Sequence, residues 1–123
     1  GRLGWMSWMI VLDDGRRIGS ISFYDIEETD RNAMLALGIS SADDMNRGYG
    51  TEAIKLVLAH GFNSMNLHRI DLRVLARNKR AIRAYEKCGF THEGTKRENA
   101  LIDGKWEDDV FMSILEHEFS PPA

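Results

Sequence analysis

Hydrophobic positions divide the chain into a first part with strand-like alternation and a later part with helical spacing. Trp5–Leu12 and Ala33–Ile39 are apolar on both alternations, which is typical of strands covered on both faces, and Arg17–Tyr24 lies between them. Asp14-Gly15 is a strong hairpin signal, and the polar, acidic run Asp25–Asn32 predicts a loop or a second hairpin turn. The first third is therefore predicted to be an antiparallel meander.

The spacing of apolar residues then changes to the helical period. A helix over Glu52–Phe62 is predicted because apolar positions recur along one face, at Ile54, Val57, Leu58, Gly61, Phe62 and Met65. Arg69–Leu75 alternates again and predicts a fourth strand. A strand, a helix and a strand within a few tens of residues form a βαβ unit. The third and fourth strands are therefore expected to be parallel neighbours with a right-handed crossover.

The last third predicts a short helix followed by a long hairpin. Asn78 is a good N-cap and Gly89 suits the position after the helix end. The inner face of this helix is marked by Ala81, Ile82 and Tyr85. Phe90–Ile102 and Trp106–Phe119 flank Asp103-Gly104, a second hairpin signal. The predicted fold class is α/β, with a mixed, mostly antiparallel sheet, a central parallel βαβ unit and a C-terminal hairpin.

Composition narrows the class of protein. A length of 123 residues favours one domain over 1–123. The net charge of −3 gives no basic balance, so a nucleic-acid partner is not expected, and a weakly acidic chain suits an amine substrate. The one cysteine, Cys88, excludes an internal disulfide and fits a reducing, cytoplasmic compartment. The chain lacks an apolar run of the ~18–20 residues that span a bilayer, so no membrane partner is expected.

The stretch Met45–Thr51 joins the third strand to the first helix through a glycine turn. Gly48 and Gly50 beside Arg47 let the chain turn tightly and leave several backbone N–H groups without partners. The positive end of the helix dipole lies there, which makes a site for a phosphate or pyrophosphate. The alternative is that the glycines only permit a tight turn. The stretch is neither a Walker A loop nor, with Ala53 in the third glycine position, the full dinucleotide-binding pattern.

A second candidate site combines Asn78 with Tyr85. These residues are seven apart, two helical turns, so they share a helix face. Their helix begins at the carboxyl end of the fourth strand, beside the glycine turn, and ligands collect at the carboxyl ends of parallel strands. The alternative is that Asn78 is only an N-cap and Tyr85 only a core aromatic residue.

The ordered set of these motifs resembles the GCN5-related N-acetyltransferase (GNAT) superfamily. The residues that carry the resemblance are Arg47-Gly48-Tyr49-Gly50-Thr51-Glu52-Ala53, then Asn78-x-x-Ala81, then Tyr85-Glu86-Lys87-Cys88-Gly89-Phe90. With Glu93-Gly94-Thr95 and Asp103-Gly104-Lys105, the set is similar to the bacterial branch that includes ribosomal-protein N-terminal and spermidine acetyltransferases. The resemblance covers residues 5–119.

The resemblance implies an acyl-CoA N-acyltransferase-like fold and an enzyme without a metal that uses acetyl-CoA as co-substrate. Acetyl would pass by direct attack to a primary amine on a protein N-terminus, a polyamine or another small molecule. Backbone amides around Asn46–Thr51 would hold the pyrophosphate, Asn78 would bind the pantetheine arm, and Tyr85 would approach the thioester sulfur as the catalytic acid. The cofactor-binding residues implied are Ile39, Ser40, Met45, Asn46, Arg47, Gly48, Tyr49, Gly50, Thr51, Asn78 and Tyr85.

Two departures from the family pattern change the expectation. Met45 stands where the family has glutamine or arginine, which removes a side-chain contact and leaves the backbone N–H groups. The family also begins with a strand and a helical pair that form a wall of the acceptor site, and these N-terminal elements are expected to be missing here. The alternative function is therefore a non-catalytic acyl-CoA-binding or interaction domain, or a truncated domain without its acceptor wall. A homodimer is expected to cover the exposed sheet edge.

The chemistry of acetyl transfer adds further candidates. An amine of pKa ~10.4 is neutral in about 1 molecule in 10³ at pH 7, a cost of roughly 4–5 kcal/mol, so a carboxylate or water must take its proton. The candidate bases are Asp25, Glu27, Glu28 and Glu98, and the alternative is that all four are solvated charges. The resemblance implies that a backbone N–H near Ile39 stabilises the oxyanion.

Three further groups have both a functional and a structural interpretation. Cys88 is either a nucleophile of a ping-pong route or a small core residue. The acidic run Glu107-Asp108-Asp109 either contacts a cationic acceptor or is a solvated turn. The histidines show no metal-ligand spacing and are expected to be polar surface or strand residues, at positions His60, His68, His92 and His117.

Overall fold

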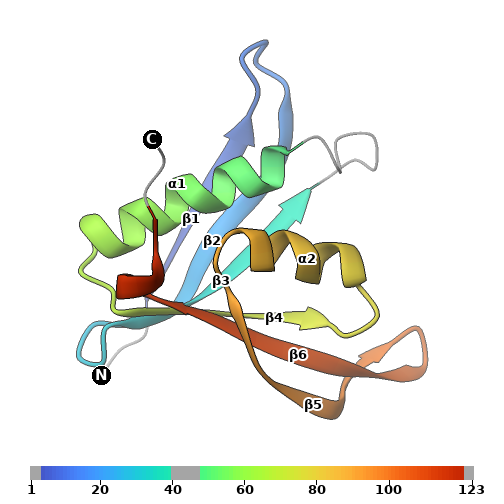
Figure 1. Ribbon diagram of the computed structural model, residues 1–123. Coiled ribbons are helices and arrows are strands. Elements are labelled where there is room, and N and C mark those ends of the chain that lie inside the picture. Colours follow the sequence, from blue (N-terminus) through green and yellow to red (C-terminus); the bar gives the residue numbers. More distant parts are fainter. Residues whose placement is uncertain (1–3, 40–47, 121–123) are drawn as a thin grey trace.

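The computed structural model describes residues 4–39 and 48–120, which form a six-stranded sheet and two α-helices (Figure 1). The strand order is β1-β2-β3-β4-β6-β5. The strands are β1 (Gly4–Val11), β2 (Arg17–Glu27), β3 (Asn32–Ile39), β4 (Arg69–Leu75), β5 (Thr91–Ile102) and β6 (Lys105–Leu115). The helices are α1 (Tyr49–Asn63) and α2 (Lys79–Lys87), and a 3₁₀ turn covers Glu116–Glu118.

The predicted parallel pair is confirmed, and it is short. β3 and β4 share three residue pairs, which are Asn32 with Arg69, Ala33 with Ile70 and Met34 with Asp71. Beyond that point β3 continues beside β2 as far as Ile39, and β4 continues beside β6 as far as Leu75. The carboxyl ends of the two parallel strands therefore diverge, and the sheet opens between them (Figure 1).

Both helices pack on the same face of the sheet. A Cβ atom added to Gly61 of α1 would lie 3.1 Å from Ile70 of β4, and one added to Gly89, after α2, would lie 3.0 Å from Ile114 of β6. Ile70 and Ile114 are cross-strand partners in an antiparallel pair, so their side chains point to one face. The core lies between this face and the helices, and its fully buried residues include Phe23, Leu58, Leu72 and Met112.

The expectation that β1 and β3 are covered on both faces is wrong for the described residues. On β1, Trp8 and Ile10 pack against the core, whereas Trp5 is 72% exposed and Met9 is 55% exposed. On β3, Leu35 is buried and Ala36 is exposed. The reason is that the two helices cover one face only, and an apolar pattern shows which residues favour burial without showing what covers them.

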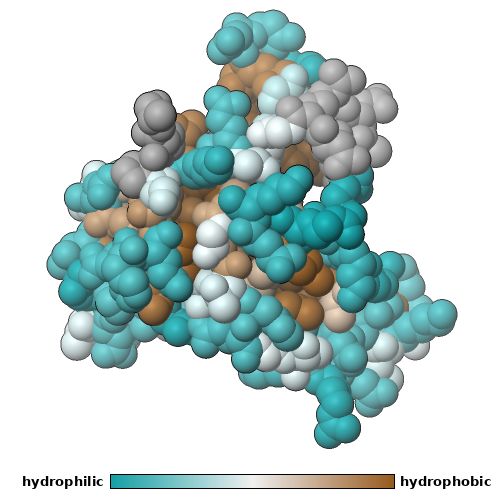
Figure 2. All heavy atoms as spheres, in the orientation of Figure 1, coloured by the Kyte–Doolittle hydropathy of each residue, from teal (hydrophilic) through white to brown (hydrophobic). Residues whose placement is uncertain are grey.

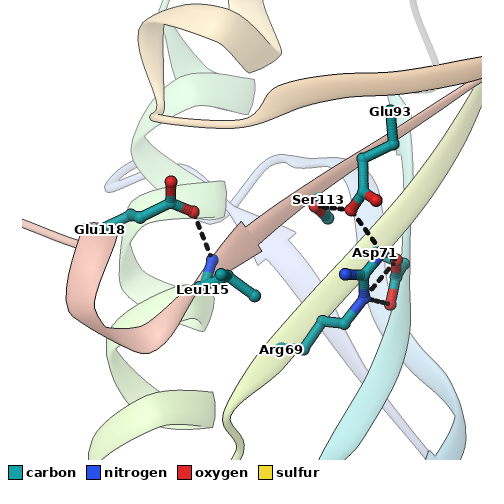
Figure 3. A network of polar contacts seen from close by, with 6 residues as sticks. All are labelled: Arg69, Asp71, Glu93, Ser113, Leu115 and Glu118. Carbon is teal, nitrogen blue, oxygen red and sulfur yellow. Dashed lines mark hydrogen bonds and ion pairs between the residues drawn. The ribbon is translucent and has the colours of Figure 1, made fainter.

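The open face of the sheet carries a polar network at the level where the parallel strands part (Figure 3). Arg69 binds Asp71 through Nε–Oδ1 (2.9 Å) and Nη2–Oδ1 (2.7 Å), and it also contacts Glu93. The hydroxyl of Ser113 donates to Glu93. This hydrogen bond and the charge of Arg69 lower the pKa of the Glu93 carboxyl. The network joins β4, β5 and β6 beside the last parallel pair.

The turns follow the sequence signals, with one shift of boundary. Gly15 (φ 88°) confirms the first hairpin turn, and Asp103 (φ 51°) with Gly104 (φ 77°) confirms the C-terminal one. The predicted loop over Asp25–Asn32 is shorter than expected, because β2 continues to Glu27 through an irregularity at which Asp25 has φ 49°. Among the described residues, no helix is long and apolar enough to cross a membrane.

The close packing of α1 on β4 generates a stability prediction. Gly61→Leu is expected to lower the free energy of unfolding by about 1–3 kcal/mol, because a side chain there meets Phe23 and Ile70 in a filled core. Denaturant unfolding followed by circular dichroism measures this change. Gly38→Ala is the matched control, since nothing lies within 4 Å of its added Cβ. Unchanged stability of Gly61→Leu would contradict the packing described.

Candidate active site

A groove of about 680 Å³ lies where β3 ends, between the start of α1 and one side of α2. It brings together six of the residues predicted from sequence: Ile39, Gly48, Gly50, Thr51, Asn78 and Tyr85. The other lining residues are Leu37, Ile54, Arg80, Ala81, Arg83, Ala84 and Lys87. The space-filling view in the orientation of Figure 1 shows hydrophobic surface between hydrophilic side chains on the face that bears the helices (Figure 2). The groove therefore occupies the opening that the diverging strands leave.

The glycines shape the floor of the groove at the start of α1. Gly48 is the N-cap, with φ 82°, a left-handed conformation that costs other residues about 1–2 kcal/mol. A Cβ on Gly50 would lie 3.3 Å from Leu37 Cδ2, so this glycine lets α1 approach β3. Gly48 has no side chain with which to cap the N–H groups of the first turn. The tight-turn interpretation is thus correct for Gly48, and the same geometry leaves helix N–H groups directed at the groove.

Not every predicted cofactor-binding residue lines this groove. Ser40, Met45, Asn46 and Arg47 lie outside the described residues. Tyr49 is described, and it lines a second hollow, of about 480 Å³, between β1 and α1. The role predicted for Tyr49 therefore concerns its backbone, because its side chain faces away from the groove.

Asn78 and Tyr85 enter the groove from α2, as their spacing predicts. Asn78 is confirmed as the N-cap, since its Oδ1 accepts a hydrogen bond of 3.2 Å from the N–H of Ala81. This bond uses the side-chain oxygen and does not involve the Nδ2 hydrogens. The ring of Tyr85 packs edge-on against Phe90, with ring centres 6.0 Å apart. Tyr85 therefore has both the predicted core contact and access to the groove.

The hydroxyl of Tyr85 is held in its protonated form. Burial raises the pKa of Tyr85 above its usual value, and the neighbouring Cys88 raises it further. A tyrosine with a raised pKa stays neutral at pH 7 and can donate a proton to an anion that forms beside it. Tyr85 is therefore a neutral hydrogen-bond donor on the lining of the groove.

The groove is cationic, a property that the sequence prediction did not include. Arg80, Arg83 and Lys87 line it, and no aspartate or glutamate is among the lining residues that the structure describes. The signal was present in the sequence as basic residues at i, i+3 and i+7 of the predicted helix. A chain of net charge −3 thus concentrates positive charge around one groove.

The four candidate bases divide between the two ends of the sheet. Asp25, Glu27 and Glu28 lie where β2 turns into β3, the end of β3 opposite Ile39. Glu98 lies in an irregular part of β5, and its N–H donates to Asp108 Oδ1 (2.8 Å). The carbonyl of Asp108 in turn accepts a hydrogen bond from Ala76, two residues before Asn78. Of the four, Glu98 is therefore the carboxylate at the same end as the groove.

The acidic run Glu107–Asp109 is engaged within the protein. Glu107 pairs with Arg77 Nε at 3.2 Å, and Asp109 Oδ2 accepts a hydrogen bond of 2.9 Å from Asn99. Asp109 is 3% exposed, so the solvated-turn interpretation is wrong for this residue.

Among residues 4–39 and 48–120, no group of three or more His, Cys, Asp or Glu side chains is arranged to hold a metal ion.

Cys88 has the surroundings of a core residue. It is 8% exposed, and burial raises the pKa of its thiol, against a smaller opposite effect of Lys55. The thiolate is the reactive form of cysteine, so a raised pKa opposes the nucleophilic role. The structure therefore favours the core interpretation of Cys88 over the ping-pong route.

Comparison with known proteins relates this geometry to a family. Residues 2–91 match the family model described as acetyltransferase (GNAT) domain. A probable N-acetyltransferase of Bacillus subtilis, YjcK, is 37% identical over 108 residues, which cover 87% of this chain and 59% of the relative. The Escherichia coli spermidine N(1)-acetyltransferase is 31% identical over 110 residues, which cover 89% of this chain and 59% of the relative. The chain thus spans 59% of the length of both relatives.

Solved structures show the same similarity. The Vibrio cholerae spermidine N-acetyltransferase in complex with CoA and spermine superposes with a TM-score of 0.87 and 28% sequence identity, covering 93% of this chain and 67% of that one. A structure described as dodecameric, from the same organism, has a TM-score of 0.86 and 28% identity, covering 91% of this chain and 65% of that one.

The burial of Cys88 generates a reactivity prediction. At neutral pH, the native thiol is expected to react with a thiol-specific disulfide reagent at least about tenfold more slowly than the thiol of the unfolded protein, because thiolate content and access both fall on folding. Absorbance of the released reagent anion measures the rate, and Cys88→Ala supplies the blank. Reaction of the native thiol at the unfolded rate would contradict the described environment.

Proposed function

The chain belongs to the acetyltransferase (GNAT) family, and on that premise we propose that it transfers acetyl from acetyl-CoA to a primary amine. The observation that carries the proposal is the groove, in which helix N–H groups, Asn78 and Tyr85 meet at the opening of a parallel strand pair. A cofactor with phosphates at one end and a thioester at the other matches this order of groups. The proposal covers this domain, whereas the relatives are longer.

The charged end of the cofactor fits the start of α1. The pyrophosphate would accept hydrogen bonds from the uncapped N–H groups beside Gly48 and Gly50, at the positive end of the helix dipole. The pantetheine arm would then run along β3 near Ile39. β3 is paired with β2 on one side as far as Ile39, and its other edge faces the gap left by β4, so its backbone groups are positioned to bind the arm as an added strand.

The chemical step requires one proton to be removed and another to be supplied. The neutral amine attacks the thioester carbonyl, and an N–C bond forms while the C–S bond breaks. The amine loses its proton to a carboxylate or water, for which Glu98 is the candidate at this end of the sheet. The departing thiolate takes the proton of Tyr85, whose raised pKa keeps it available.

The acceptor is proposed as an amine of the kinds that related enzymes are named for. Relatives of this chain include spermidine acetyltransferases and, at 22% identity, an enzyme named for the alanine of ribosomal protein uS5. Spermidine is therefore the first acceptor to test and a peptide with a free N-terminus the second. Release of free CoA after mixing with an acceptor separates transfer from the alternative, a domain that only binds acyl-CoA.

The role of Tyr85 generates the main activity prediction. Tyr85→Phe is expected to keep the affinity for acetyl-CoA and to lose at least about tenfold in turnover, the low side of what a positioned acid contributes. Detection of CoA release gives turnover, and calorimetric titration gives affinity. The ring of phenylalanine preserves the packing against Phe90, so a folding defect is not expected. An unchanged turnover would remove Tyr85 from the mechanism.

We also propose that the domain associates with a second copy through its exposed sheet edge. β1 is one of the two edge strands of the sheet in the described residues, and it exposes Trp5, Met9 and Val11 at 72%, 55% and 52%. Exposed apolar side chains on an edge strand favour association. Sedimentation at micromolar concentration is expected to show a dimer that Trp5→Lys weakens. A clean monomer at that concentration would contradict the proposal.

A further inference from the structure

Three basic side chains form one rim of the groove. Arg80, Arg83 and Lys87, called the basic rim below, follow one another along α2 at spacings of three and four residues. All three are exposed, and all three line the groove together with the first turn of α1. Ala81 and Ala84 also line the groove, and their small side chains leave it open.

In the described part of the chain, four arginines of the sheet and its turns have carboxylate partners. The N–O distances are 3.1 Å for Arg31–Glu116, 2.7 Å for Arg69–Asp71, 3.9 Å for Arg73–Asp109 and 3.2 Å for Arg77–Glu107. Within residues 4–39 and 48–120, Arg83 and Lys87 form no such ion pair. Among the described residues that line the groove, these two charges have no acidic neighbour.

Helix stability alone does not account for the basic rim. Lys87 in the last turn of α2 is favourable for the helix dipole. Arg80, the second residue of the helix, and Arg83, in its middle, gain nothing from the helix dipole, yet both line the groove. Positive charge gathered along a groove suits an anionic ligand.

Coenzyme A carries two separate anionic groups, the pyrophosphate and a phosphate on the 3′ carbon of its ribose. The start of α1 suits one of them, and the basic rim lies across the groove from it. We propose that the basic rim binds the 3′-phosphate, so that the site selects acyl-CoA over acyl donors without this group. Such donors are dephospho-CoA thioesters and the phosphopantetheine arm of a carrier protein. The inference rests on the proposed function, because it names a further contact of the same cofactor.

The test compares acetyl-CoA with acetyl-3′-dephospho-CoA by calorimetric titration. The wild-type protein is expected to bind acetyl-CoA at least about tenfold more tightly than acetyl-3′-dephospho-CoA. A single hydrogen bond between charged groups is strong enough to change an affinity about tenfold. In the variant Arg83→Gln/Lys87→Gln this preference is expected to fall to less than about threefold, and adding Arg80→Gln is expected to remove the remainder. The affinity for the dephospho donor should stay within about twofold, as it lacks the group that the rim binds.

Lys79→Gln is the matched control. Lys79 is an exposed lysine on the same helix that does not line the groove, so this variant should keep the full preference. Thermal unfolding without ligand checks that each variant is folded, and the double variant leaves Arg80 and its contacts intact.

Two results would overturn the inference and leave the proposed function standing. One is equal binding of both donors by the wild-type protein, and the other is an unchanged preference in the folded double and triple variants. Failure of the wild-type protein to bind either donor would instead overturn the proposed function and the inference together.

Discussion

The short pairing of β3 with β4 is the constraint on which the rest of the structure depends. The two strands share three residue pairs and then follow different neighbours, β2 and β6. Strand edges that separate inside a sheet leave backbone groups without partners, and such groups are costly when buried. In this fold, the gap opens on the face where α1 and α2 lie, and the groove there runs between the start of α1 and one side of α2. A ligand with amides along its length and anions at one end would match the strand edge and the helix start.

The two ends of the groove differ in charge. Its α1 end offers uncapped N–H groups, and its rim offers three cations, which together suit phosphates. Its inner end holds Tyr85 against Phe90, where burial raises the pKa of the phenol. Cys88, three residues after Tyr85, is buried as well and also has a raised pKa. The groove therefore has positive charge at its entrance and a neutral phenol at its inner end.

The sequence predicted the elements well where local physics decides them. The alternation of Arg69–Leu75 matched β4 residue for residue, Asn78 caps α2, and Gly89 has the left-handed φ of 105° that its position required. The exposure of one face of β1 was not predictable from the sequence. The apolar side chains of Trp5 and Met9 favour burial, but they do not show whether another element covers that face.

The candidate site was predicted in part for similar reasons. Glycine and N-cap chemistry located Gly48, Gly50 and Asn78, and the structure places them in one groove. The relative positions of the carboxylates depend on strand direction and pairing, which set Asp25 and Glu98 at opposite ends. The most direct test of the central claim is a thermal-shift series with acetyl-CoA, CoA, ATP and NAD, on wild-type protein and on Ala84→Leu, which fills the groove. A ligand at 100 times its Kd adds about 2.7 kcal/mol to stability, so acetyl-CoA and CoA should raise the Tm of the wild-type protein by several degrees, NAD should do little, and Ala84→Leu should abolish the shift. No shift with acetyl-CoA, or an equal shift in Ala84→Leu, would contradict the account.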